Sequence, residues 1–125
     1  MLGSYRLTAF LPTADSEKAR AFYESILGLK TLSDDPFALV MDAAGIQLRI
    51  TKVKDFKPQS FTVLGWEVPD IEKSTTALRE KGVRFEFYGF EGQAKTGIWS
   101  APGGAKVAWF KDPDGNILSI TQHSS

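Results

Sequence analysis

The chain has 125 residues, about the size of one domain with a buried core. Its 15 basic and 15 acidic residues balance and are spread along the sequence, which excludes the basic surface typical of nucleic-acid-binding proteins. Cysteine is absent, which excludes disulfides, thiolate metal sites and a cysteine nucleophile, and no run approaches the ~18 apolar residues of a membrane span. With no secretory signal pattern at the N-terminus, we expect a cytoplasmic protein that binds neither nucleic acid nor membrane.

The first half of the sequence predicts a strand, a helix and three further strands. Residues from Tyr5 to Leu11 alternate with strand spacing, and Asp15 is a typical helix N-cap. Apolar residues then recur at intervals of three and four as far as Gly28, a common helix terminator. The three strands that follow are expected at residues 30–32, 37–41 and 46–51.

The second half repeats this order after the loop KDFKPQS. A strand at 61–68 leads to a helix that begins after Asp70 and ends at Gly82, and three strands follow. Because each copy is too small to stand alone, each is expected to bury its sheet against the other. The sequence predicts an α+β protein with a single domain over residues 1–125, with module one at about 4–53 and module two at about 60–123.

Residues 108–120 read AWFKDPDGNILSI, two apolar runs joined by a tight polar corner. Pro113 presets the backbone of a turn, Asp112 and Asp114 are suited to bond nearby backbone N–H groups, and Gly115 tolerates a positive φ. A calcium loop would need more oxygen ligands and a distal glutamate. This stretch therefore predicts a hairpin turn and not a cation site.

The module-two helix is followed by a glycine-rich segment, GFEGQAKTGIWSAPGGA, that has no counterpart in module one. Its Trp99 is suited either to close over a ligand as part of a lid or to pack within a long hairpin. Phe87, Tyr88 and Phe90 form a second aromatic cluster near this segment. Strand alternation places Trp66 in the core on the helix side, whereas it does not fix the facing of Trp109.

Three stretches carry a resemblance to a known family: ARAFYESILGLK after the first strand, EVPDIEKSTTALREKGVRF in the second half, and AWFKDPDGNILSI at the end. Their order and spacing resemble the vicinal oxygen chelate superfamily, which includes glyoxalase I, extradiol dioxygenases and the bleomycin-resistance proteins. The resemblance covers almost the whole chain. It implies paired βαβββ modules whose eight strands curl into a cup, with the helices outside and the ligand within.

In the metal-dependent members of that family, four inward side chains, mostly His and Glu, hold one divalent ion. The corresponding positions here are Thr8, Gln47 or Arg49, Val63 and Ser119. Val63 has no donor atom, neutral hydroxyls are poor ligands, and the charge of Arg49 would repel a cation. We therefore expect neither a metal ion nor another cofactor. The single histidine, His123, lies beyond the last strand and is expected at the surface.

Strand alternation from these positions predicts a cup face with aromatic and apolar side chains and a few polar groups, as is usual in small-molecule pockets. This face is expected to carry Arg6, Thr8, Phe10, Gln47, Arg49, Phe61, Val63, Glu67, Ile117, Ser119 and Thr121. The candidate ligand-binding residues are Thr8, Phe10, Gln47, Arg49, Phe61, Val63, Glu67, Trp99 and Ser119. Either Arg49 and Glu67 neutralise each other as an ion pair, or Arg49 binds a carboxylate, phosphate or carbonyl oxygen of the ligand.

Nucleophilic catalysis has no support in the sequence, because no histidine lies near Ser119 or Thr8 and no Gly-x-Ser-x-Gly motif is present. The sequence favours a metal-free, non-enzymatic protein that binds or sequesters a small, aromatic or anionic organic molecule in its cup. One alternative is a metal-dependent glyoxalase, isomerase or dioxygenase-type enzyme with displaced ligands, and another is a non-catalytic interaction module. A homodimer is expected, since related small members often pair and symmetric dimers are the commonest oligomers.

Overall fold

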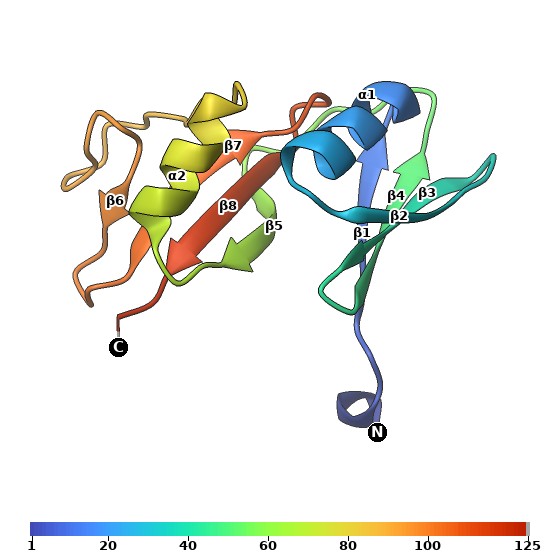
Figure 1. Ribbon diagram of the computed structural model, residues 1–125, viewed down its shortest axis with the longest axis horizontal. Coiled ribbons are helices and arrows are strands. Elements are labelled where there is room, and N and C mark those ends of the chain that lie inside the picture. The colour runs from blue at the N-terminus through green and yellow to red at the C-terminus, as the bar shows by residue number, and fades with distance from the viewer. Residues whose placement is uncertain (125) are drawn as a thin grey trace. The chain divides into compact units, whose positions relative to one another are not determined.

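The computed structural model describes residues 1–124, which form two compact units, one of Met1–Lys57 and one that begins at Pro58. The boundary falls within the loop KDFKPQS. Each unit contains a sheet and a helix in the order strand, helix and three strands, which confirms the α+β class and the two βαβββ modules (Figure 1). That both units act as a single domain over residues 1–125 stays a prediction.

The first unit has a helix on one face of a four-stranded sheet of order β1-β4-β3-β2, in which β1 is parallel to β4 and the other pairs are antiparallel. The first strand begins later than predicted, at Thr8, because residues 5–7 have no partner in the sheet; a short 3₁₀ turn, η1, precedes them. The elements are η1 (Leu2–Ser4), β1 (Thr8–Thr13), α1 (Ser16–Arg20), the π-helical continuation η2 (Ala21–Ile26), β2 (Lys30–Asp34), β3 (Ala38–Ala43) and β4 (Ile46–Lys52).

The second unit repeats this plan with a sheet of order β5-β8-β7-β6, in which β5 is parallel to β8. Its elements are β5 (Thr62–Glu67), α2 (Ile71–Glu80), β6 (Trp99–Ser100), β7 (Lys106–Lys111) and β8 (Ile117–Gln122). Strand β6 has two residues, so most of the chain between α2 and β7 is irregular. Within residues 1–124, no helix is long and apolar enough to cross a membrane.

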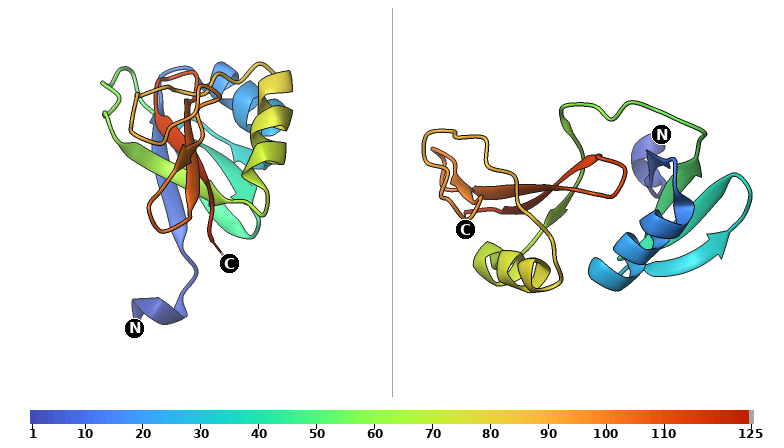
Figure 2. Two further views of the ribbon diagram at one scale, coloured as in Figure 1. Left: turned by 90° about the vertical axis from the view of Figure 1, so that its left-hand side faces the viewer. Right: turned by 90° about the horizontal axis from the view of Figure 1, so that it is seen from above.

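In each unit the helix covers one face of the sheet (Figure 2), and apolar side chains are buried between them. Asp15 and Asp70 begin the two helices as predicted, because each side chain accepts a hydrogen bond of 3.2 Å from the backbone N–H three residues later. The core of the first unit includes Leu11, Tyr23, Leu39, Met41, Leu48 and Ile50. The core of the second unit includes Ile71, Ala108, Phe110, Leu118 and Ile120, with Trp66 half-buried on the same face, as predicted.

The DPDG corner forms the tight turn between β7 and β8, as the sequence predicts. Oδ1 of Asp112 accepts hydrogen bonds of 2.9 Å from the backbone N–H groups of Asp114 and Asn116. Oδ2 accepts a third bond of 2.9 Å from the Asn116 side chain, and Gly115 has a φ of 89°. Both carboxylate oxygens are thus engaged in the turn. The turn fixes the register of the hairpin, and with it the direction in which each β7 side chain points.

Candidate functional site

The face of the second sheet opposite α2 carries Trp109. In β7, Trp109 alternates with the buried core residues Ala108 and Phe110, so it points away from the helix. It pairs with Ser119 of β8, which pairs in turn with Gly65 of β5. A Cβ atom at Gly65 would lie 2.6 Å from the Ser119 hydroxyl oxygen, so a larger residue at position 65 would clash with the Ser119 side chain unless that side chain moved. The pairing of β7 with β8 therefore shows that Trp109 lies on the face opposite α2, which the alternation of the sequence alone does not determine.

Three further rings surround Trp109, all from the segment between α2 and β7. The ring centroids of Tyr88, Phe90 and Trp99 lie 5.6, 5.8 and 6.1 Å from that of Trp109. These are distances at which edge-to-face and tilted rings attract one another. We refer to Tyr88, Phe90, Trp99 and Trp109 as the aromatic cluster.

Trp99 belongs to a hairpin, which is one of the two roles that the sequence left open. It pairs with Val107 across β6 and β7, and its indole N–H donates a hydrogen bond of 3.0 Å to the Glu91 carbonyl. Its role in ligand binding stays a prediction.

A hollow of about 250 Å³ opens beside the aromatic cluster. The side chains that line it are aromatic, aliphatic or hydroxyl-bearing: Ser60, Phe61, Thr62, Tyr88, Phe90, Trp109 and Ile117. Tyr88 is 42% exposed and Phe90 is 48% exposed, so a molecule in the hollow would have access to ring surface that the fold leaves uncovered. We refer to this feature as the aromatic hollow.

Gln93 fixes the chain segment that carries Tyr88 and Phe90. Its side-chain oxygen accepts hydrogen bonds of 2.8 and 3.0 Å from the backbone N–H groups of Tyr88 and Gly89. Its amide nitrogen donates bonds of 3.1 and 2.9 Å to the carbonyls of Glu86 and Gly97. The Gln93 side chain therefore accepts two hydrogen bonds and donates two. These bonds hold a segment that is not paired in the sheet along most of its length.

A second hollow of about 340 Å³ adjoins the first and shares Ser60, Tyr88 and Ile117 with it. It adds Lys111, whose ammonium nitrogen lies 3.5 Å from Oε1 of Glu86. Partial burial raises the pKa of the Tyr88 phenol above its ordinary value, and the negative charge of Glu86 raises this pKa further. At neutral pH, Tyr88 is therefore an uncharged phenol at the junction of the two hollows.

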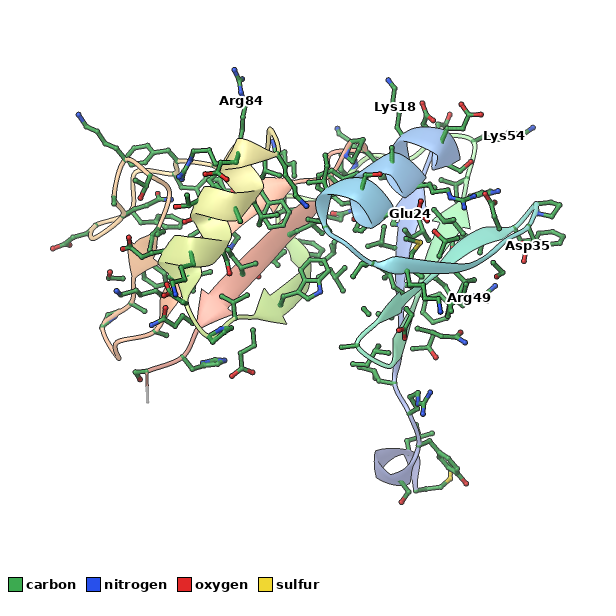
Figure 3. The ribbon with its side chains drawn as sticks, viewed as in Figure 1. Lys18, Glu24, Asp35, Arg49, Lys54 and Arg84 are labelled. Atoms are coloured by element: carbon green, nitrogen blue, oxygen red, sulfur yellow. The ribbon has the colours of Figure 1, made fainter. Side chains whose placement is uncertain are left out.

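The predicted site residues of the first unit share the face of their sheet opposite α1. Thr8 pairs with Gln47, and Phe10 pairs with Arg49, so two rows of side chains lie next to each other. Phe10 is 63% exposed and Arg49 is half-buried. Figure 3 labels Arg49 and also Asp35, which lies between β2 and β3. The register thus brings Thr8, Phe10, Gln47 and Arg49 together, and their binding role stays a prediction.

Asp35 is the acidic residue whose charge Arg49 influences within this unit. Its carboxylate accepts hydrogen bonds of 2.9 and 2.7 Å from the backbone N–H groups of Ala38 and Phe37. These bonds lower the pKa of Asp35 below its ordinary value, and the positive charges of Arg49 and Lys52 lower this pKa further. Asp35 is therefore ionised at neutral pH, and the charges of Arg49 and Lys52 favour that state.

The predicted site residues of the second unit are less closely grouped. Phe61 lines the aromatic hollow, and Ser119 lies between Gly65 and Trp109. Regular pairing continued from Gly65 and Ser119 would place Val63 opposite Ile117, but a bulge between Thr62 and Leu64 places Thr62 there instead. The prediction for Val63 assumed that side chains alternate between the two faces along the whole of β5, and the bulge interrupts this alternation at the start of the strand.

Glu67 and His123 lie close to each other at the surface of the second unit. The side chain of Glu67 is 73% exposed, and that of His123, 3.8 Å away, is 62% exposed. The surface position of His123 agrees with the prediction. An ion pair between Glu67 and Arg49 would join the two units and stays a prediction.

The residues at the four positions for which the family resemblance implies metal ligands do not fit a divalent ion. Thr8 and Ser119 offer neutral hydroxyls, Val63 offers no donor, and Gln47 offers a neutral amide. Within residues 1–124, no group of three or more His, Asp or Glu side chains is arranged to hold a metal ion.

Comparison with known proteins identifies the family. The family model of the Glyoxalase/Bleomycin resistance protein/Dioxygenase superfamily matches residues 6–120. No curated protein sequence is significantly similar to this one.

Three solved structures illustrate the similarity. TnmS3, an antibiotic binding protein from a Streptomyces species, is 26% identical with a TM-score of 0.72, and the match covers 96% of each chain. A member of the same superfamily from Sphaerobacter thermophilus is 25% identical with a TM-score of 0.73, covering 95% of this chain and 97% of that one. A lactoylglutathione lyase from Agrobacterium tumefaciens, 15% identical with a TM-score of 0.73 and coverages of 95% and 93%, shares the fold. The chain belongs to the Glyoxalase/Bleomycin resistance protein/Dioxygenase superfamily.

Proposed function

We propose that the protein binds or sequesters a small, aromatic or anionic organic molecule in its cup without the help of a metal ion. The observation that carries this proposal is the aromatic hollow, where several rings converge on about 250 Å³ of space. Convergent rings with a few polar groups are the usual composition of a small-molecule site. The similarity to an antibiotic binding protein at 26% identity supports the same class of function.

The donor chemistry supports binding without metal-dependent catalysis. Glyoxalases and dioxygenases that use a metal ion need carboxylate or imidazole ligands, and this chain has an aliphatic group, hydroxyls and an amide or a guanidinium at the corresponding positions. The proposal includes the expected homodimer and the expected cytoplasmic location.

Replacing Phe90 by alanine tests the hollow directly. We expect Phe90→Ala to weaken the binding of naphthol or naphthoate by about tenfold, equivalent to about 1.4 kcal/mol, because a ring that would contact the ligand is lost. The measurement is a calorimetric titration of each variant.

Phe87→Ala is the matched control. Phe87 is an exposed phenylalanine of the same segment, 57% exposed against 48% for Phe90, and it does not line the hollow. The Phe87→Ala variant should therefore bind naphthol and naphthoate as tightly as the unmodified protein does. Equal losses in both variants, or no loss in either, would show that the hollow is not the binding site.

A further inference from the structure

The charge of the residues that line the aromatic hollow bears on the kind of ligand that it could hold. Its lining consists of four aromatic residues, one isoleucine, one serine and one threonine, and among the described residues that line it none carries a formal charge. A carboxylate or phosphate that entered this space would lose its hydration and find no cation to replace it. An uncharged molecule would lose far less hydration free energy on entering the hollow.

The lysine that lines the adjoining hollow lies beside a carboxylate. Lys111 lines the adjoining hollow, not the aromatic hollow itself, and its ammonium group lies 3.5 Å from the carboxylate of Glu86. An anionic ligand that approached Lys111 would also approach Glu86. The attraction and the repulsion largely offset each other, so this pair gives little preference for an anion.

The size of the hollow limits the ring system that it can hold. A closed apolar cavity of about 150 Å³ accommodates one benzene ring. The aromatic hollow offers about 250 Å³, which suits two fused rings, and parts of a larger molecule would extend outward. Ser60 and Thr62, which also line the hollow, carry hydroxyl groups of the kind that can bond a hydroxyl or carbonyl on the edge of a ligand.

We infer that the ligand, or the part of it that enters the hollow, is an uncharged planar aromatic group of about two fused rings with a hydroxyl or carbonyl at its edge. This inference rests on the proposed function and narrows its ligand class from aromatic or anionic to neutral aromatic.

Three naphthalene derivatives that differ in charge test the inference on the unmodified protein. At neutral pH, naphthol is uncharged, naphthoate is an anion and naphthylmethylamine is a cation. Calorimetric titration should show naphthol binding at least about tenfold more tightly than naphthoate, because the hollow does not compensate for a lost hydration shell. Naphthol should also bind more tightly than the cation, for the same reason.

Two lysine variants identify the cause of any charge preference. Lys111→Gln removes the cation that lines the adjoining hollow, and Lys106→Gln makes the same change on the same strand at a residue that lines neither hollow. Both variants should bind naphthol and naphthoate as the unmodified protein does. Retention of naphthol binding also shows that each variant is folded.

The outcomes separate this inference from the proposed function. Naphthoate binding as tightly as naphthol, with a specific loss in Lys111→Gln, would overturn the neutral ligand class while leaving small-molecule binding in place. Preferred binding of the amine would overturn it as well and would indicate attraction between a cation and the ring faces. Absence of binding by all three compounds would overturn both this inference and the proposed function.

Discussion

Replacing Asp112 by alanine is expected to lower the free energy of unfolding by about 3 kcal/mol, because a carboxylate that accepts three hydrogen bonds is lost at a buried turn. Asp112 and Asn116 are 5% and 3% exposed, so water cannot readily replace the lost acceptor for the Asn116 amide. Chemical denaturation measured by circular dichroism gives the free energy directly.

The comparison with Asp112→Asn identifies which bonds matter. Asparagine keeps one oxygen to accept the backbone N–H groups of Asp114 and Asn116, and it loses the acceptor for the Asn116 side chain. We expect a loss of about 1 kcal/mol for this variant. If both variants lost the same free energy, the backbone bonds would not be the main contribution of Asp112 to the turn.

Replacing Gln93 by leucine is expected to lower the free energy of unfolding by about 2 kcal/mol and to weaken ligand binding by about tenfold. Leucine is similar in size but makes none of the four hydrogen bonds that hold residues 86–89 and Gly97. Tyr88 and Gly89 are exposed, so water can compensate in part for the bonds that their N–H groups lose, and the stability loss is below the sum for four buried bonds. The loss of affinity follows because Tyr88 and Phe90 are no longer held beside Trp109.

Hydrogen exchange separates positioning from general destabilisation in this variant. The backbone amides of Tyr88 and Gly89 should exchange faster in Gln93→Leu, while amides between β7 and β8 keep their protection. Faster exchange at these two amides with an unchanged dissociation constant for naphthol would contradict the positioning role of Gln93.

The sequence predicts the order of elements well because the signals that set it are local. Asp15 and Asp70 each occupy an N-cap position that a single side chain and a nearby N–H group define. Gly28 and Gly82 have positive φ values of 80° and 95°, as expected for residues that end helices. These features need no knowledge of tertiary packing, and both modules show them.

The facing of Trp109 was also predictable from the sequence, through the hairpin turn. Asp112 and Asn116 pair across the DPDG turn, and regular antiparallel pairing continued from them places Trp109 opposite Ser119. Because alternation already assigns Ser119 to the face opposite the helix, Trp109 belongs to that face too. The type of turn thus determines on which face of the sheet Trp109 lies, whereas the apolar pattern of β7 alone does not.

The rest of the site could not be predicted, because it depends on contacts between distant or irregular segments. The bulge that replaces Val63 by Thr62 opposite Ile117 has no signature in the alternation of β5. The segment that carries Tyr88, Phe90 and Gln93 has no helical or strand period, and its conformation depends on side-chain bonds to the backbone. The sequence therefore indicated an aromatic cluster near residue 88 but not the hollow that it borders.

The most direct test of metal-free binding is a calorimetric titration of the protein with naphthol, with and without excess EDTA. The rings and hydroxyls of the aromatic hollow form a site that contains no metal ligand, so the dissociation constant should be the same in both titrations. Binding that disappears in EDTA and returns when zinc or another divalent ion is added in excess would contradict the account.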